Sequence, residues 1–325
     1  MSYKRKRSSD FLPVGDSSLA FTVTSVDTNK RLDSYISEKT NLSRSKIQKF
    51  IQQGRVFVNE RQVSQNYKVK YLDTITITIK EETPITLIAE PIPIDICYKD
   101  DFIVVVNKNA GMVVYPSFGH NKGTLINAIY YHCQKLAYIG MPLRPGIVHR
   151  LDKDTSGVMV IAIDDDAYYG LVKQFSERTI NRRYLALISG NPLKNEGEII
   201  NPIGRSINDR KKMSVKTKKG KEALTKWKVI ERYNGASLIE TRLGTGRTHQ
   251  IRVHLSSIGH PVLGDSLYGK KTFIQIGKSK IPLQRQMLHA ETLGFTHPIN
   301  NQYLEFSAPM PLDMKECIEK IKILI

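Results

Sequence analysis

A short stretch of the chain, from Arg144 to Gly157, concentrates two carboxylates among several cations. Asp152 and Asp154 lie two positions apart in it, and neighbouring cations favour the ionised form of a carboxyl group. An ionised carboxylate on a loop suits a nucleophile or a general base, and it does not suit a general acid. The stretch is also compatible with an ordinary surface turn, because Thr155-Ser156-Gly157 is typical turn sequence.

The two aspartates are not equivalent. Asp154 precedes Ser156-Gly157 by two positions, which is good turn chemistry, so we interpret it as structural. For Asp152, composition leaves a catalytic and a structural role equally open. A glycosidase-like hydrolase that pairs the two carboxylates is disfavoured. Such pairs lie roughly 5 to 9 Å apart across the substrate, and residues i and i+2 of one loop seldom face each other that way.

A second candidate segment begins with Gly244-Thr245-Gly246, whose glycines allow a ligand to approach the backbone closely. After it, Ile251, Val253 and Leu255 either alternate as in a strand or share one face of a short helix. The pattern does not decide between the two. The segment therefore predicts a binding loop followed by an element that is either a strand or a helix.

Metal binding and membrane insertion have little support in the sequence. His249 and His254 lie five positions apart with no cysteine or carboxylate nearby, so we expect no metal site. The three cysteines form no C-x-x-C pair, which fits a reducing cytoplasm rather than a zinc knuckle or a disulfide framework. No apolar stretch approaches the roughly 20 residues of a membrane span, and no apolar signal core follows the basic N-terminus. We predict a cytoplasmic protein without membrane association.

The charge balance indicates a polyanionic partner. Lys and Arg number 49 against 31 Asp and Glu, a formal net charge of +18. Nucleic acid is the expected partner, because each phosphate that is neutralised also releases a counterion. The densest basic stretch, 204–221, includes Lys211 and Lys212 and has Asp209 as its single acid. It is either a solvated hairpin or, as we favour, a loop that grips RNA.

The stretch from His149 reads His-Arg-Leu-Asp-Lys-Asp-Thr-Ser-Gly and resembles the signature of the RluA-type pseudouridine synthases. Segments 245–254 and 259–269 continue the resemblance, which is strongest to the RluD-type members acting on large-subunit ribosomal RNA. It implies that Asp152 is catalytic and that Arg252 pairs with it and holds it charged. It also implies that Tyr184 packs on the target uracil, although a tyrosine that starts a strand is most often core filling.

The resemblance implies isomerisation of uridine to pseudouridine, with no metal, nucleotide or redox cofactor. One carboxylate is enough, whether it attacks the base or the sugar or removes the C2′ proton. Arg150 is implied to help displace the target nucleotide or to occupy its place, and Arg247 and His249 to contact RNA. Two alternatives stay open, namely the same chemistry on transfer RNA and a non-catalytic RNA-binding factor in ribosome assembly.

Residues 25–83 read as a separate small module. The pattern predicts a helix over Arg31–Lys39, a second helix capped by Ser43 and ended by Gly54, and a half-buried strand at 74–79. The module resembles the S-four-type RNA-binding domain, which recognises folded RNA by shape and phosphate contacts. The resemblance is carried by Arg31-Leu32-Asp33, Ser43-Arg44-Ser45 and Gly54-Arg55-Val56, and the cations expected to face RNA are Arg31, Arg44, Lys46, Lys49 and Arg55.

The expected layout has four parts. A flexible basic tail covers residues 1–24, the RNA-binding module 25–83, a proline-rich linker 84–94 and the catalytic domain 95–325. Many short strands close together in sequence predict an α+β fold whose mixed, mostly antiparallel sheet is flanked by helices. We expect the protein to act as a monomer.

Overall fold

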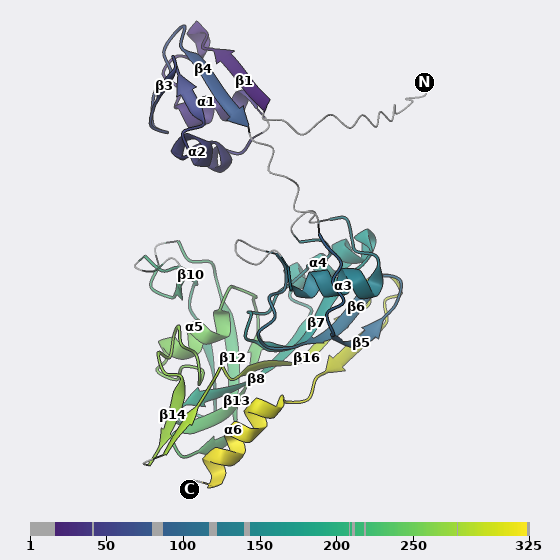
Figure 1. Ribbon diagram of the computed structural model, residues 1–325. Helices are drawn as coiled ribbons and strands as arrows, with labels where there is room; N and C mark the ends of the chain where they lie inside the picture. Colours follow the sequence, from purple (N-terminus) through teal and green to yellow (C-terminus); the bar gives the residue numbers. More distant parts are fainter. Residues whose placement is uncertain are drawn as a thin grey trace. The chain divides into compact units, whose positions relative to one another are not determined.

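The computed structural model describes residues 17–40, 42–79, 87–116, 122–139, 144–207, 209, 212–217, 219–277 and 279–323. The chain divides into two units, Met1–Ile85 and Thr86–Ile325, which Figure 1 draws with their elements labelled. Each unit has its own buried apolar core. Among the described helices, none is long and apolar enough to cross a membrane.

The first unit packs two helices and a short 3-10 turn against one four-stranded sheet, whose strand order is β1-β4-β2-β3. Its elements are β1 (Ser17–Thr22), η1 (Ser25–Asp27), α1 (Leu32–Lys39), α2 (Arg44–Gln52), β2 (Val56–Val58), β3 (Arg61–Gln62) and β4 (Thr74–Ile79).

The predicted helices and strands of this unit are present. The hydroxyl of Ser43 accepts a hydrogen bond from the backbone N–H of Lys46 and so caps α2. Gly54 follows the helix with a φ of +70°, in the left-handed region. The alternating pattern of β4 puts Ile75 and Ile77 into the core, both with no exposed surface.

The predicted tail, residues 1–24, was too long. Ser17–Thr22 is strand β1, which pairs with β4 along its whole length, from Ser17 opposite Ile79 to Thr22 opposite Thr74. The apolar side chain of Phe21 packs on the core of the unit. The few apolar residues of Ser17–Thr22 do not stand out from a polar tail in the sequence. The segment becomes a strand because β4 offers an edge for pairing.

The predicted linker, residues 84–94, was also too long; of it, 84–86 lie outside the described residues. Leu87 is buried in the core of the second unit. The side chain of Asn127 donates to the carbonyl of Ile88, and the backbone N–H of Glu90 donates to the carbonyl of Asn127. Pro91 and Pro93 therefore belong to a segment that is bound to α3 (Leu125–Cys133) of the catalytic unit.

The second unit is built on a nine-stranded sheet of order β5-β6-β7-β16-β8-β13-β12-β9, with β17 paired to β16. The pair β7–β16 is parallel and the other pairs are antiparallel, which confirms the expected mixed sheet. The strands are β5 (Asp95–Lys99), β6 (Ile103–Lys108), β7 (Ser156–Ala162), β8 (Asn181–Ser189), β9 (Glu196–Ile200), β12 (Leu224–Tyr233), β13 (Ala236–Leu243), β16 (Leu288–Thr296) and β17 (Tyr303–Ser307).

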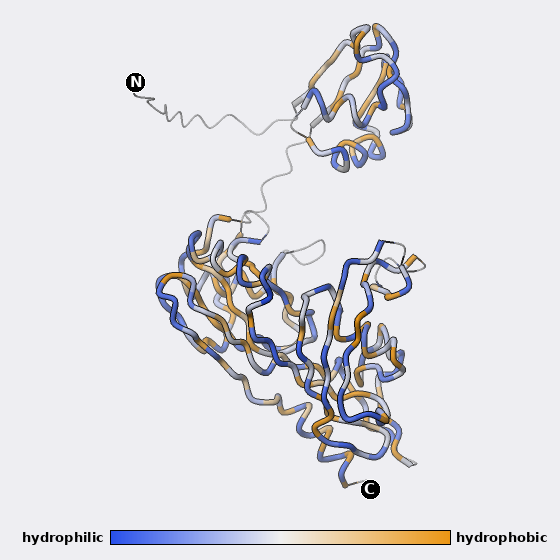
Figure 2. The backbone as a smooth tube through the Cα atoms, turned by 180° about the vertical axis from the view of Figure 1, so that it is seen from behind, coloured by the Kyte–Doolittle hydropathy of each residue, from blue (hydrophilic) through white to orange (hydrophobic). Residues whose placement is uncertain are grey.

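Helices flank this sheet, and two small hairpins extend from it (Figure 1). The helices besides α3 are α4 (Asp165–Glu177), α5 (Gln250–Ser257) and α6 (Leu312–Ile323). The hairpins are β10–β11 (Gly204–Arg205 and Met213–Ser214) and β14–β15 (Phe273–Ile276 and Ser279–Pro282). Figure 2 shows hydrophobic residues recurring along the strands and hydrophilic stretches at the margins of the unit. The segment whose type the sequence left open, 250–257, is a helix.

Candidate active site

Asp152 lies in the loop that leads into β7, and its position is set by the residue before it. Leu151 is only 4% exposed and packs in the main core. The carboxylate of Asp152 is instead partly open, with 17% of its side chain exposed. The loop therefore anchors one side chain in the core and presents the next at the surface of a cavity.

The cation in contact with Asp152 is Arg252, from α5. Nη1 of Arg252 lies 2.8 Å from Oδ2 of Asp152. The cations close to Asp152 in sequence are placed elsewhere, since the guanidinium groups of Arg144 and Arg150 lie over the ring of Tyr115, 4.5 Å and 5.4 Å from its centroid. The charge that faces the carboxylate thus comes from a residue 100 positions away.

Arg252 is oriented by a second carboxylate, which lies in the segment 259–269. Asp265, 1% exposed, accepts hydrogen bonds from Nε of Arg252 at 2.7 Å and from its Nη2 at 3.0 Å. Burial alone would lower the pKa of Arg252, but the bonds to Asp265 and Asp152 raise it above its usual value. The guanidinium is therefore a fixed, permanently charged partner for Asp152.

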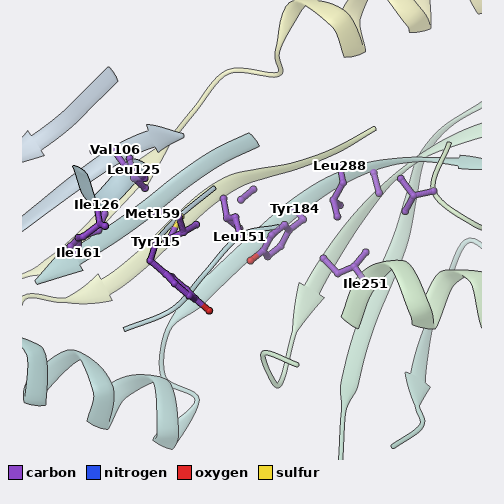
Figure 3. Packing of buried hydrophobic residues seen from close by; sticks show 14 of the residues in the cluster. Val106, Tyr115, Leu125, Ile126, Leu151, Met159, Ile161, Tyr184, Ile251 and Leu288 are labelled. Carbon is purple, nitrogen blue, oxygen red and sulfur yellow. The ribbon is translucent and has the colours of Figure 1, made fainter. Parts of the chain in front are cut away.

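Tyr184, on β8, is 7% exposed and belongs to the apolar cluster beneath the cavity. Figure 3 shows it between Leu151 and Leu288, with Ile251 of α5 nearby. Burial raises the pKa of its hydroxyl. Tyr184 therefore belongs to the core, as is usual for a tyrosine at the start of a strand, and it also lines the cavity.

A cavity of 490 Å³ surrounds these residues. Ligand sites in proteins usually measure roughly 300 to 1,000 Å³, so its size suits a nucleotide-sized ligand. Its wall combines apolar and charged side chains from the segment between β6 and α3, the loop before β7, strands β8 and β16, and the start of α5. They include Tyr115, Arg150, Leu151, Asp152, Tyr184, Arg247, His249, Arg252 and Leu288.

His249 lies at the cavity wall, at the start of α5, with a φ of +56°. Its Nε2 is 3.8 Å from Oδ1 of Asp152, and its Nδ1 is 2.8 Å from the hydroxyl of Tyr268. Burial lowers its pKa, although the Asp152 carboxylate acts in the opposite direction. Arg247 lines the same wall, and its Nε donates to the carbonyl of Glu222.

Buried donors support the Asp152 loop from below. The ammonium of Lys108, 1% exposed, donates to the carbonyls of Asn109, Met112 and Lys153. Burial lowers the pKa of Lys108 to about 7, although the carboxylates of Asp154 and Asp152 act in the opposite direction. Arg285 donates through Nη1 to the carbonyl of Asp154. The sequence did not predict a role for Lys108. Its only distinguishing feature there is its place at the end of an apolar strand.

The histidines of the two motifs other than His249 are structural. Nε2 of His149 accepts the backbone N–H of Val160, and its ring stacks on Phe175 at 4.7 Å. Burial lowers the pKa of His149 to about 3, so the ring is neutral. His254 is fully buried and bonded to Thr225 and to the carbonyl of Asn201. In the described part of the chain, no group of three or more potential metal ligands occurs.

Two cations of the first unit, Arg31 and Arg44, share one carboxylate. Asp33 is fully buried and accepts hydrogen bonds from Arg31, Arg44 and Gln48. Hydrogen bonds from Arg31 above all lower its pKa, despite burial.

The other cations of the first unit that are expected to face RNA lie on α2 or just after it. Two more belong to the β10–β11 hairpin of the second unit. Lys46 and Arg55 both lie 5.8 Å from the ring centroid of Phe50, and Lys49 belongs to α2. Lys212 lies in the β10–β11 hairpin, where its backbone N–H donates to the carbonyl of Asp209. Lys211 lies outside the described residues.

A carboxylate fixed by a buried arginine at the wall of an open cavity, in a protein of charge +18, is the arrangement of an enzyme acting on a polyanion through one carboxylate. Residues 102–257 match the family described as RNA pseudouridylate synthase, and residues 30–75 match the S4 domain. The chain belongs to the RNA pseudouridine synthase family, and the enzyme is an RNA pseudouridine synthase with an S4 domain.

Similar proteins cover nearly the whole chain. The Bacillus subtilis protein "Uncharacterized RNA pseudouridine synthase YlyB" is 42% identical, over 93% of this chain and 97% of that one. "Ribosomal large subunit pseudouridine synthase D" of Zymomonas mobilis is 44% identical, over 87% and 91%. The solved structure of human RNA pseudouridylate synthase domain containing 1 matches with a TM-score of 0.51 at 25% identity, over 71% of this chain and 95% of that one.

Proposed function

We propose that Asp152 is the catalytic carboxylate of this pseudouridine synthase and that its substrate is large-subunit ribosomal RNA. The observation that carries the first part is the contact of Asp152 with Arg252 at the wall of the cavity that Tyr184 also lines. The second part is supported by relatives at 40% and 44% identity named "Ribosomal large subunit pseudouridine synthase D".

The reaction requires one ionised carboxylate and a uracil base that is held inside the cavity. The glycosidic bond of the uridine breaks, the base turns, and a bond forms between C5 and the ribose, with no group entering or leaving. Asp152 attacks the base or the sugar, or removes the C2′ proton. Arg252 keeps the carboxylate charged, and Tyr184 packs on the uracil, which must leave its stack to reach the cavity.

Other cations hold the RNA. In our proposal Arg150 leaves the ring of Tyr115, on which it now lies, and helps displace the target nucleotide or takes its place. Arg247 and His249 contact the nucleotide at the cavity wall. Phosphates are bound by the S4 unit and the basic hairpin, through Arg31, Arg44, Lys46, Lys49, Arg55, Lys211 and Lys212. We propose a monomer that acts in the cytoplasm, where sedimentation of the purified protein tests the first point.

The decisive variant is Asp152→Asn, which keeps the shape of the side chain and removes its charge. We expect pseudouridine formation to fall by at least about 10³-fold while RNA affinity changes less than twofold, because a catalytic group acts in the transition state. Asp166→Asn, an exposed residue of the first turn of α4, is the matched control. An active Asp152→Asn enzyme would overturn the assignment, and would leave a role as a non-catalytic assembly factor.

The substrate is tested by mapping pseudouridine in ribosomal and transfer RNA from cells with and without the gene. We expect sites to disappear from large-subunit ribosomal RNA. Loss confined to transfer RNA would contradict the proposed substrate, and loss at no site would contradict the activity. Release of free uracil from RNA by the purified enzyme would instead indicate a hydrolase.

A further inference from the structure

The hydroxyl of Tyr268 connects the basic hairpin β10–β11 to the wall of the active site. It accepts a hydrogen bond from the backbone N–H of Met213, which is in β11, at 2.9 Å. The same oxygen lies 2.8 Å from Nδ1 of His249. One phenol therefore touches the hairpin that we assign to RNA binding and a residue beside Asp152.

The direction of these hydrogen bonds determines which nitrogen of His249 carries hydrogen. Burial raises the pKa of Tyr268 to about 12, so its hydroxyl keeps its single hydrogen. The oxygen accepts from Met213, and we assign its own hydrogen to Nδ1 of His249, 2.8 Å away. Because the imidazole is neutral, an acceptor at Nδ1 leaves the hydrogen on Nε2.

That Nε2–H faces the oxygen of Asp152 that Arg252 leaves open. Arg252 binds Oδ2 of Asp152 at 2.8 Å, whereas Nε2 of His249 is 3.8 Å from Oδ1. A distance of 3.8 Å exceeds the 2.7 to 3.2 Å usual for N–H···O bonds, and catalytic hydrogen bonds are often long before the substrate binds. A shift of about 1 Å would close this gap to hydrogen-bond distance.

The two partners of Asp152 share a support. Asp265 binds the guanidinium of Arg252 and also accepts the backbone N–H of Tyr268 at 3.0 Å. The guanidinium in turn lies over the ring of Tyr268, at 5.2 Å from its centroid. Asp265 thus holds Arg252 and the backbone of Tyr268, whereas the hydroxyl at the far end of the Tyr268 side chain is bonded to the hairpin and to His249.

We propose that His249 is a positioning residue that donates its Nε2–H to Oδ1 of Asp152 when RNA is bound, and that Tyr268 couples this bond to the position of hairpin β10–β11. The inference rests on the proposed catalytic role of Asp152. RNA held by the hairpin shifts Met213, Tyr268 and His249 together and closes the 3.8 Å gap. The carboxylate is then held at both oxygens only while substrate is on the hairpin.

Tyr268→Phe tests the coupling, because it keeps the ring beneath Arg252 and removes the hydroxyl that joins Met213 to His249. We expect the single-turnover rate to fall about tenfold, the effect of roughly one hydrogen bond, with RNA affinity unchanged within twofold. Tyr303→Phe is the matched control, since it removes a tyrosine hydroxyl bonded to Glu305 on β17. An unchanged rate in Tyr268→Phe, or a loss confined to RNA affinity, would overturn the proposal.

His249 offers a second pair of variants. The side-chain amide of glutamine can place a donor near the position of Nε2, whereas that of asparagine reaches only the position of Nδ1. We therefore expect His249→Gln to retain more of the single-turnover rate than His249→Asn. A His249 that only contacts RNA would instead give equal rates and weaker binding in both variants.

A double-mutant cycle shows whether Tyr268 acts through His249. In the His249→Asn background we expect Tyr268→Phe to cause no further loss of rate, because the bond it supports is already gone. Additive losses would overturn the coupling. Asp152→Asn measured in the same assay separates the two proposals. If it is active, both fail, and if it is inactive while the losses are additive, only the coupling fails.

A readout independent of variants is the nitrogen NMR spectrum of His249 in the wild-type protein. We expect its Nε2 to be protonated and its Nδ1 unprotonated, both with and without RNA. The opposite tautomer would overturn the proposal, since Nε2 would then have no hydrogen to donate to Asp152.

Discussion

Each unit of the molecule contains an aspartate bound by arginine, and the two pairs are buried the opposite way round. In the S4 unit the side chain of Asp33 is 0% exposed, while those of Arg31 and Arg44 are 42% and 53% exposed. In the catalytic unit the arginine is the buried member, at 8% exposure for Arg252 against 17% for Asp152.

The difference lies in which member of each pair is open to solvent. A buried charge must be paired and hydrogen-bonded, so the buried member has a fixed orientation that it imposes on its partner. In the proposed function Asp33 thereby arranges cations for phosphate groups. Arg252, bound on its other side by Asp265, would arrange the carboxylate of Asp152 for the reacting nucleotide.

Of the two buried members, the arginine of the catalytic pair should give the larger effect when it is replaced. Arg252→Lys keeps the charge and loses the fork that bonds Asp152 and Asp265 together. We expect kcat to fall about a hundredfold, as for loss of one preorganised donor. Arg232→Lys, whose guanidinium bonds to loop carbonyls, is the control. Full activity of Arg252→Lys would show that charge alone is enough.

Removing the buried charge of the other pair should affect binding and leave catalysis intact. Asp33→Asn releases Arg31 and Arg44 from their shared acceptor, so both must be ordered when RNA binds. We expect RNA affinity to weaken about tenfold, a loss of two charge-assisted hydrogen bonds partly offset by the remaining cations. Titration of RNA and the single-turnover rate at saturating RNA measure the two quantities. A lower rate at saturation would contradict the comparison.

Acid should loosen the S4 unit through Asp33. The pKa of Asp33 is lowered in the folded unit, so it contributes stability above the unfolded carboxyl value of about 3.9, and this is lost as pH falls through the folded pKa. We expect the protection of the α1 and α2 amides against hydrogen exchange, relative to the intrinsic rate at each pH, to fall below about pH 4 in the full chain. In Asp33→Asn this loss of protection should be weaker, and an identical pH profile would exclude Asp33 as its cause.

The smallest effect is expected from a single exposed cation. Arg44→Ala removes one predicted phosphate contact, so the slope of log affinity against log salt should decrease by about 0.7 to 0.9. The single-turnover rate at saturating RNA should stay the same. A slope identical to that of the wild type would place Arg44 away from the phosphates.

Much of the fold follows from local patterns. The Ser43 cap, the left-handed Gly54 and the alternating Thr and Ile of β4 act within a few residues, and the structure contains the elements they predict. Strand β1 and the segment 87–94 were misread, as a tail and a linker. Their structure comes from pairing with β4 and from bonds to α3, and neither partner is close in sequence.

The site divides in the same way. The motif around Asp152 and the one around Arg252 were found in the sequence, and the structure places the two in contact. Asp265 and Tyr268 lie in the segment 259–269, which continues the resemblance without implying a role for either in the site, and Lys108 had no signal beyond its place at the end of an apolar strand. Each acts on a residue brought near by the sheet, so its role depends on distances that no spacing along the chain encodes.

By itself the sequence determined a strongly basic chain, because charge is a property of the residues, and its motifs predicted one reactive aspartate through their resemblance to a known family. Only the tertiary structure decided which cation faces that aspartate. Its neighbours Arg144 and Arg150 turn to Tyr115, while Arg252 arrives on a helix 100 positions later. The physical reason is that an ion pair depends on separation in space and on burial, and both are set by how the strands and helices pack.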